Sequence, residues 1–336
     1  MNELDEIIKN NPYLQQNPQF NNVIHWLDSK IPDNYKTNFY TNLKTLKITT
    51  ELQEDENEKV GKYSSRNNEI LLNEQRLRNL SDNINIQNII VEGSFLHELC
   101  HMASSNYDKE NEVILNGFCK YTNDKTERNI GLTEGFTEIL ASNYMMNMGD
   151  HSMYLTEMSI VYQLGLVIGF DKIKEAYFGN LGIEELEKSL YTYDNDKQRV
   201  HKLFENIENN YLLKDFNGPQ PVFKEIETYL IDLFNIKLEK GNYQAEEKQE
   251  LLNRFVNAIL SNEEIQKLGL NPDNLEYDEI MEHFVDIKNM NKQTLNKGES
   301  RKLTKSSGNI NVLLLTLLTG FIMGVTSILS YLIISR

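Results

Sequence analysis

The chain has 336 residues, of which 50 are acidic and 34 basic, so its formal net charge is −16. This length can bury one large hydrophobic core or two smaller ones. The acidic balance argues against nucleic acid as a partner, because phosphate binding requires a basic face. Two cysteines, Cys100 and Cys119, are too few for a disulfide scaffold, and the first residues lack the apolar run of a signal peptide. We therefore expect a reducing, cytoplasmic compartment.

Residues 1–44 predict a polar helical lead-in, because short helical patterns there are separated by prolines. Residues 46–50 alternate between apolar and polar side chains, which predicts a strand at the start of a domain covering residues 45–210. Residues 60–73 contain two short β-type runs joined by a polar turn, which predicts a hairpin. This hairpin is either an ordinary structural element or an exposed edge that pairs with an extended peptide, and the residues leave both interpretations open.

A five-residue motif, His97-Glu98-Leu99-Cys100-His101, lies near the end of an apolar run that begins at about Ile84. On a helix, histidines four residues apart share one face and can bind the same metal ion, as in H-E-x-x-H zinc sites. Glu98 lies beside that face, where it can take a proton from a water molecule on the ion. A single histidine on a half-buried helix is more often a hydrogen-bonded core residue. Here the helix is apolar almost all round, so its buried polar groups need partners, and a metal supplies them.

Residues 105–129 are rich in charge and predict an irregular connection, and a connection of this length in a compact domain is often functional. Gly131 then opens a second helix that we expect to run to about Met148. Glu134 and Glu138 are four residues apart on this helix and share one face. Their spacing lets one carboxylate bind a metal ion while the other holds a histidine ring.

Together, the motifs HELCH and GLTEGFTE resemble the gluzincin group of zinc metallopeptidases, which includes thermolysin-like and membrane alanyl aminopeptidase-like enzymes. The resemblance covers residues 45–205 of the chain. It implies five site residues: His97, His101 and Glu134 as zinc ligands, Glu98 as the general base, and Glu138 as the partner of a ligand. It also implies that the hairpin at residues 60–73 is the strand on the substrate side of the motif helix.

The chain departs from this group at one position, since Thr133 stands where Asn is usual. No Gly-x-Met-Glu-Asn signature precedes the motif, so we do not expect aminopeptidase activity. A metzincin site does not fit, because Ser104 and Tyr107 occupy the positions where that group needs Gly and His.

Residues 158–169 are apolar, but twelve residues cannot cross a bilayer, so they predict a buried helix under the site. The gluzincin resemblance implies a Tyr or His from a later helix that contacts the oxyanion. We expect His201 in this catalytic role, with Tyr191 and Tyr193 as alternatives. Residues 211–289 show helical, amphipathic patterns and no motif.

Residues 290–308 predict a polar linker, and residues 309–335 predict a single membrane anchor. Within the anchor, residues 312–335 form an apolar run without any charge, and these 24 residues span roughly 36 Å at about 1.5 Å per residue. Four basic residues between positions 297 and 305 precede it and only Arg336 follows it, so the positive-inside rule places the catalytic part in the cytoplasm. Gly320 and Gly324 form a GxxxG pair that is compatible with a dimer.

The expected fold is mainly α, of the α+β class. It has a zincin-like domain with a small β-sheet beside the motif helix, a helical C-terminal part and one C-terminal transmembrane helix. The expected function is that of a membrane-anchored zinc metallopeptidase acting on a peptide or protein, in which Zn²⁺ lowers the pKa of a bound water from about 15.7 towards 7. The alternative is a catalytically inactive zinc-binding module tethered to the membrane. Glu98 favours the enzyme, because a structural zinc site needs no base and usually has four protein ligands.

Overall fold

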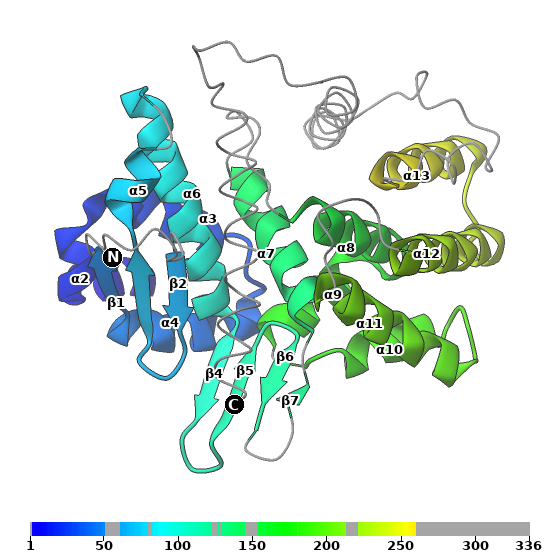
Figure 1. Ribbon diagram of the computed structural model, residues 1–336, viewed down its shortest axis with the longest axis horizontal. Helices are drawn as coiled ribbons and strands as arrows, with labels where there is room; N and C mark the ends of the chain where they lie inside the picture. The colour runs from blue at the N-terminus through cyan, green and yellow to red at the C-terminus, as the bar shows by residue number, and fades with distance from the viewer. Residues whose placement is uncertain are drawn as a thin grey trace, which may run out of the picture.

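The computed structural model describes residues 2–50, 61–79, 82–122, 126–127, 129–144, 154–179, 181–212 and 221–259. In these ranges the chain is mainly helical and contains two small sheets, as Figure 1 shows. The expectation of a mainly helical chain with a small sheet is therefore confirmed. The predicted linker, the membrane anchor and the glycine pair Gly320 and Gly324 lie outside the described residues. None of the helices within those ranges is long and apolar enough to cross a membrane.

The chain begins with four short helices: α1 (Glu3–Asn10), α2 (Pro12–Gln16), α3 (Asn21–Asp28) and α4 (Lys36–Thr45), with 3-10 turns at Pro18–Phe20 and Asp33–Tyr35. Asparagine side chains cap the N-terminal ends of α1 and α2. Asn2 Oδ1 accepts the N–H of Asp5 at 2.8 Å, and Asn11 Oδ1 accepts the N–H of Tyr13 at 2.9 Å. Each bond satisfies a backbone donor that the first helical turn leaves unpaired. The predicted helical lead-in thus consists of separate short helices, of which the first two are capped by asparagine side chains.

The first sheet has the strand order β1 (Lys47–Thr50), β3 (Glu69–Leu72), β2 (Gly61–Ser64). Strands β1 and β3 are parallel, and β2 and β3 form an antiparallel hairpin. Both the strand at residues 46–50 and the hairpin at residues 60–73 are therefore confirmed. Within the described sheet β2 is an edge strand, and it lies beside the motif helix.

The motif helix is α6 (Ile84–Ala103), which follows the short α5 (Glu74–Arg78). Its residues Phe95, Leu96 and Leu99 are fully buried. The ring of Phe95 stacks on that of Phe20, with centroids 3.8 Å apart. This confirms the expected buried helix, whose apolar face holds it against the N-terminal helices.

Two asparagines of α4 cap the C-terminal end of α6. Asn42 Nδ2 donates to the carbonyl oxygens of Met102 (2.9 Å) and Ser105 (2.7 Å). Asn38 Nδ2 donates to the carbonyl oxygens of Ala103 (3.2 Å) and Ser105 (3.0 Å). The last carbonyls of a helix have no partner within it. These bonds therefore fix the turn of α6 that carries the second histidine of the motif.

The expectation of an irregular connection at residues 105–129 is wrong, because an antiparallel four-stranded sheet lies there. It consists of β4 (Ser105–Asp108), β5 (Val113–Asn116), β6 (Cys119–Tyr121) and β7 (Thr126–Glu127). Lys109, Glu110 and Glu112 lie in the turn between β4 and β5. Asp108 Oδ1 accepts the N–H groups of Glu110 (2.9 Å) and Asn111 (3.2 Å), and Gly117 adopts a positive φ of 57° in the next turn. The strands are only two to four residues long, and the polar residues of the turns between them made the whole segment resemble a loop.

The remaining described helices are α7 (Ile130–Tyr144), α8 (Leu155–Ile168), α9 (Phe170–Phe178), α10 (Glu184–Leu190), α11 (Lys197–Leu212), α12 (Pro221–Lys240) and α13 (Ala245–Ala258). Helix α7 packs against both α6 and α8, and α8 also contacts α9, α12 and α13. This confirms the expected buried helix at residues 158–169. Buried hydrophobic residues from both halves of the chain form one cluster, so α6 and α7 meet inside a single core.

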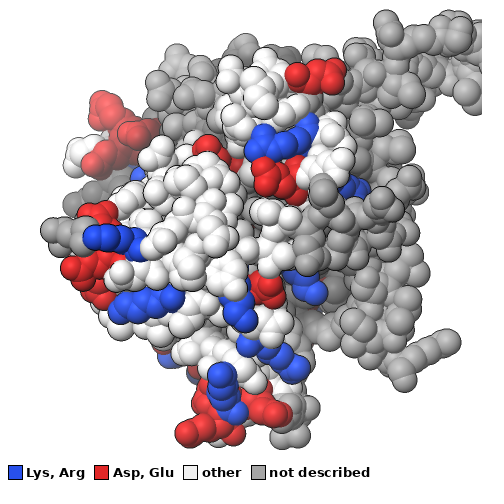
Figure 2. Space-filling view, turned by 90° about the vertical axis from the view of Figure 1, so that its left-hand side faces the viewer, with Lys and Arg blue, Asp and Glu red and all other residues white. Residues whose placement is uncertain are grey.

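Charged residues are mixed on the face that Figure 2 shows, which lies at the left of Figure 1. Basic and acidic side chains surround a broad neutral area, and no continuous basic area forms among the residues drawn there in colour.

Candidate metal centre

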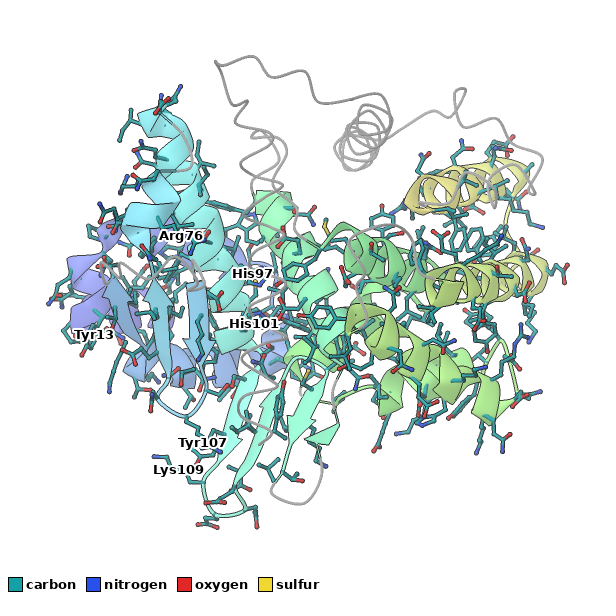
Figure 3. The ribbon with its side chains drawn as sticks, in the orientation of Figure 1. Tyr13, Arg76, His97, His101, Tyr107 and Lys109 are labelled. Atoms are coloured by element: carbon teal, nitrogen blue, oxygen red, sulfur yellow. The ribbon has the colours of Figure 1, made fainter. Side chains whose placement is uncertain are left out.

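Two histidines lie one turn apart on α6 and face α7. Figure 3 shows His97 and His101 near the centre of the molecule, between the N-terminal elements and the later helices. Their side chains are only 15% and 10% exposed. Two imidazoles at this depth need polar partners, because an unpaired buried polar group costs free energy.

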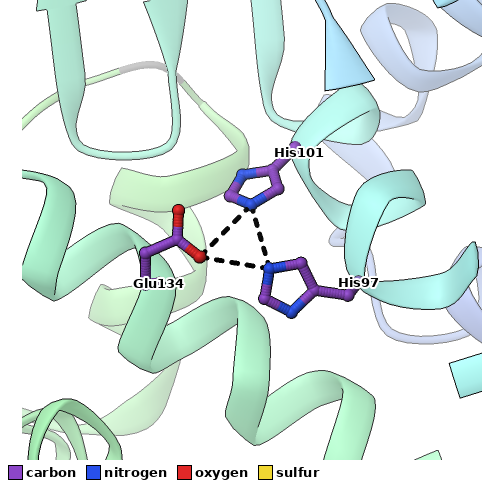
Figure 4. A group of neighbouring side chains, drawn as sticks. All are labelled: His97, His101 and Glu134. Atoms are coloured by element: carbon purple, nitrogen blue, oxygen red, sulfur yellow. Dashed lines mark hydrogen bonds and ion pairs between the residues drawn. The ribbon is translucent and has the colours of Figure 1, made fainter. Parts of the chain in front are cut away.

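Glu134 of α7 completes a group of three donor atoms, drawn in Figure 4. Its Oε2 atom lies 3.1 Å from His97 Nε2 and 3.6 Å from His101 Nε2, and the two Nε2 atoms are 3.3 Å apart. Zinc–ligand bonds of about 2.0–2.1 Å in a tetrahedron separate neighbouring ligand atoms by about 3.3 Å. The three atoms therefore have the spacing of three corners of a tetrahedral site, and the group can hold a metal ion.

Glu138 lies one turn after Glu134 and contacts the other nitrogen of His97. Its Oε2 atom is 3.1 Å from His97 Nδ1. A carboxylate can only accept, so Nδ1 carries the proton and donates it. In the neutral ring this leaves the lone pair of Nε2 directed at Glu134, where two electron-rich atoms are 3.1 Å apart. Such a contact is favourable only with a proton or a cation between them.

The charges of the site shift the pKa values in opposite directions. Burial lowers the pKa of the His97 ring, but hydrogen bonds to Glu134 and Glu138 outweigh it and hold that pKa well above its ordinary value. Burial would raise the pKa of the Glu134 carboxyl, but the charges and hydrogen bonds of His101 and His97 hold it well below its ordinary value. The cluster thus attracts positive charge in its centre.

Glu98 lies next to His97 on α6 and borders the edge strand β2. Glu98 is only 9% exposed. A Cβ atom added at Gly61 of β2 would lie 3.1 Å from Glu98 Oε1 and 3.2 Å from its Cγ atom. Glycine therefore lets the backbone of β2 run close beside this carboxylate. The candidate base Glu98 and the backbone of the edge strand β2 therefore lie in close contact.

The structure does not bring His201 to this group. Its side chain is 60% exposed on α11, where Nδ1 lies 2.9 Å from Glu187 Oε1 and Nε2 lies 3.7 Å from Glu205 Oε1. Tyr191 and Tyr193 precede the same end of α11 and are partly exposed. His201 is thus engaged with surface carboxylates.

The opposite end of α11 reaches the metal-ligand helix α7. The N–H of Ile130 donates to Glu208 Oε2 at 2.8 Å, and a Cβ atom added at Gly131 would lie 2.8 Å from the Cβ atom of Tyr211. Ten residues separate His201 from Tyr211, or about 15 Å along a helix. A helix is therefore present at His201, and its C-terminal end contacts α7.

Two tyrosines that the sequence did not single out lie beside the site. The ring of Tyr154 stacks on His97, with centroids 5.8 Å apart and planes at 20°. Burial and the charge of Glu134 raise the pKa values of Tyr154 and Tyr211 well above the ordinary value for tyrosine. Both phenols therefore stay protonated at neutral pH and can donate. Tyr211 follows the buried Phe204 and Ile207 at helical spacing, which is a signal in the sequence, whereas Tyr154 has none.

Comparison of the chain with protein-family models, with curated proteins and with solved structures gives no match. A functional assignment must therefore rest on the residues of the site. His97, His101, Glu134 and Glu138 meet there, and Glu98 lies beside them.

Proposed function

We propose that this chain is a zinc-dependent metallopeptidase of the gluzincin type, held at the membrane by its C-terminal segment with the site facing the cytoplasm. The observation that carries the proposal is the triangle of His97 Nε2, His101 Nε2 and Glu134 Oε2, with sides of 3.1, 3.3 and 3.6 Å. Two imidazoles and one carboxylate are a donor set that zinc binds in catalytic sites. A fourth position is left for water or substrate in such sites.

When bound, zinc supplies Lewis acidity, which lowers the pKa of a coordinated water from about 15.7 towards 7 and polarises a peptide carbonyl. Glu98 accepts the proton of the attacking water and returns it to the leaving amine. Its place next to His97 on α6 and its burial put this carboxylate beside the water position of such a site. Glu138 keeps the proton of His97 on Nδ1, so that Nε2 remains a ligand.

Tyr154 and Tyr211 replace His201 as the residues that we expect to stabilise the oxyanion. Their phenols are protonated at neutral pH and lie under the influence of the Glu134 charge. A donor directed at developing negative charge in a dry site lowers the barrier of acyl transfer. His201 is mostly exposed and lies against Glu187 and Glu205 instead.

The edge strand β2 favours a peptide substrate bound in extended form. An extended peptide can add to the edge of a sheet through backbone hydrogen bonds. A Cβ atom on Gly61 would point at Glu98, so this carboxylate lies over one face of the sheet at its edge strand, and a peptide added to β2 would extend that face. This supports the second of the two interpretations that the sequence leaves open for the hairpin.

Glu98→Gln tests the proposal against an inactive zinc-binding module. The full-length protein in detergent should cleave casein, and the variant should keep its zinc and its fold while losing cleavage. Glu92→Gln is the matched control on the same helix, since Glu92 accepts from Tyr144 outside the metal group. Equal activity of wild type and Glu98→Gln would favour the inactive module.

A further inference from the structure

The turn between β5 and β6 is bonded to the end of α6. Ser104, the residue after that helix, is fully buried, and its Oγ atom donates to the carbonyl oxygen of His101 at 3.2 Å. The same Oγ atom accepts the N–H of Gly117 at 3.1 Å. A hydroxyl can donate and accept at once, so it connects the helix turn of His101 to the backbone of the β5–β6 turn.

The next N–H group of the same turn is bonded to α7. Phe118 N–H donates to Thr133 Oγ1 at 3.1 Å, and Thr133 is 3% exposed and directly precedes Glu134. Consecutive backbone N–H groups of Gly117 and Phe118 therefore hold the two helices that carry the candidate ligands. The connection from His101 to Thr133 thus runs through the side chains of Ser104 and Thr133, and the N–H of Gly117 also lies 3.3 Å from the backbone carbonyl oxygen of Ser104.

Packing leaves this turn little freedom. Gly117 has a φ of 57°, a conformation that other residues rarely adopt. A Cβ atom there would lie 2.8 Å from both Thr133 Cγ2 and Tyr177 Cε2. The backbone of the turn thus lies directly against α7, and Figure 1 shows the sheet that carries it below α6 and α7.

We infer that the Gly117–Phe118 turn is a spacer that sets the distance between the two imidazoles and Glu134, with Ser104 and Thr133 as positioning residues. The inference rests on the proposed metal site. The reason is geometric: the imidazoles and Glu134 come from different helices, and the turn is bonded to each helix within three residues of a ligand. Neither Ser104 nor Thr133 is required to touch the metal or the substrate.

Thr133→Val tests the spacer, because valine keeps the shape of threonine and removes the acceptor of the Phe118 N–H. Thr133→Ser keeps the hydroxyl. Ser159→Ala is the structural control, since the buried Ser159 hydroxyl donates to the carbonyl of Ala258 on α13, away from the ligands. The readouts on full-length protein are zinc affinity by chelator competition, the visible spectrum of the Co²⁺ form, and thermal unfolding without metal.

We expect Thr133→Val to bind zinc about 10- to 100-fold more weakly, as for other residues that orient ligands, and to alter the Co²⁺ spectrum. Thr133→Ser should keep the wild-type zinc affinity and Co²⁺ spectrum, and Ser159→Ala should lower only the unfolding temperature. If Thr133→Val does not fold, Ser104→Ala removes the side-chain bonds at the other end of the connection and leaves the backbone bond of Gly117 to Ser104, so zinc affinity should fall in the same direction by a smaller factor. Wild-type zinc affinity and spectrum in the folded variant would overturn the spacer alone. Wild-type protein that binds neither ion would overturn the spacer and the proposed function together.

Discussion

His97 lies between Glu134 and Glu138, two carboxylates of one helix that each approach a different ring nitrogen at 3.1 Å. A neutral imidazole has only one N–H to donate, so one of these two contacts lacks a proton. Either a second proton or a metal ion must supply the missing positive charge. The space between His97 Nε2 and Glu134 can therefore hold either a proton or a metal ion, and the two cations compete for Nε2.

This competition predicts that zinc binding releases a proton. The pKa of His97 in the metal-free fold lies well above its ordinary value of 6.5. Protonation of the ring therefore stabilises the metal-free protein fully below pH 6.5, and this stabilisation is lost as the pH rises through the raised pKa. Zinc affinity should rise about tenfold per pH unit between those two values, because one proton must leave.

Calorimetry of zinc binding at pH 7 in buffers of different ionisation enthalpy measures the released proton. We expect about one proton per ion. An apparent enthalpy that does not depend on the buffer would show that His97 is already neutral at this pH.

Glu134 and Glu138 should differ in their effects on metal content, although both contact His97. Glu134→Gln removes a charged ligand, so the purified protein should lose its zinc. Glu138→Gln leaves all three candidate ligands and weakens only the support of one ring, so the affinity should fall about tenfold while the fold is kept. Elemental analysis and chelator competition distinguish the two. Full zinc stoichiometry in Glu134→Gln would rule out Glu134 as the third ligand.

The residues of the metal group could be predicted from the sequence because they occur in pairs with a short helical spacing. His97 and His101, and likewise Glu134 and Glu138, are four residues apart, so each pair shares a helix face whatever the rest of the fold does. Only the meeting of the two helices had to be assumed. Tyr154 and Tyr211 depend instead on how α8 and α11 pack against α7, which no local spacing encodes. The surroundings of His201 likewise depend on how its helix packs: its ring lies 2.9 Å from a carboxylate oxygen of Glu187, which no local spacing encodes.

Gly135, between the two acidic residues of α7, should tolerate no larger side chain. A Cβ atom there would lie 2.5 Å from the carbonyl oxygen of Glu157 and 2.6 Å from its carbonyl carbon, both backbone atoms of α8. Gly135→Ala gains about 1 kcal/mol of helix propensity, but overpacking of a core costs about 1–3 kcal/mol. Because α8 cannot move without disturbing the core, we expect net destabilisation and a thermal midpoint lower by several degrees. Ser142→Ala, which adds no atom to α7, is the control, and an unchanged midpoint in Gly135→Ala would contradict the close approach.

Cys119 and Cys100 should be unreactive in the folded protein. Both thiols are buried and free, and burial raises the pKa of Cys119 to about 11. The thiolate is the form that reacts, so it is scarce at pH 8 and becomes more abundant only as the pH approaches 11. Ellman's reagent at pH 8 should therefore label neither cysteine in the native chain and both in denaturant. Cys100→Ala isolates Cys119 for the same measurement, and rapid labelling of that variant under native conditions would show that the contact between the second sheet and α7 opens readily.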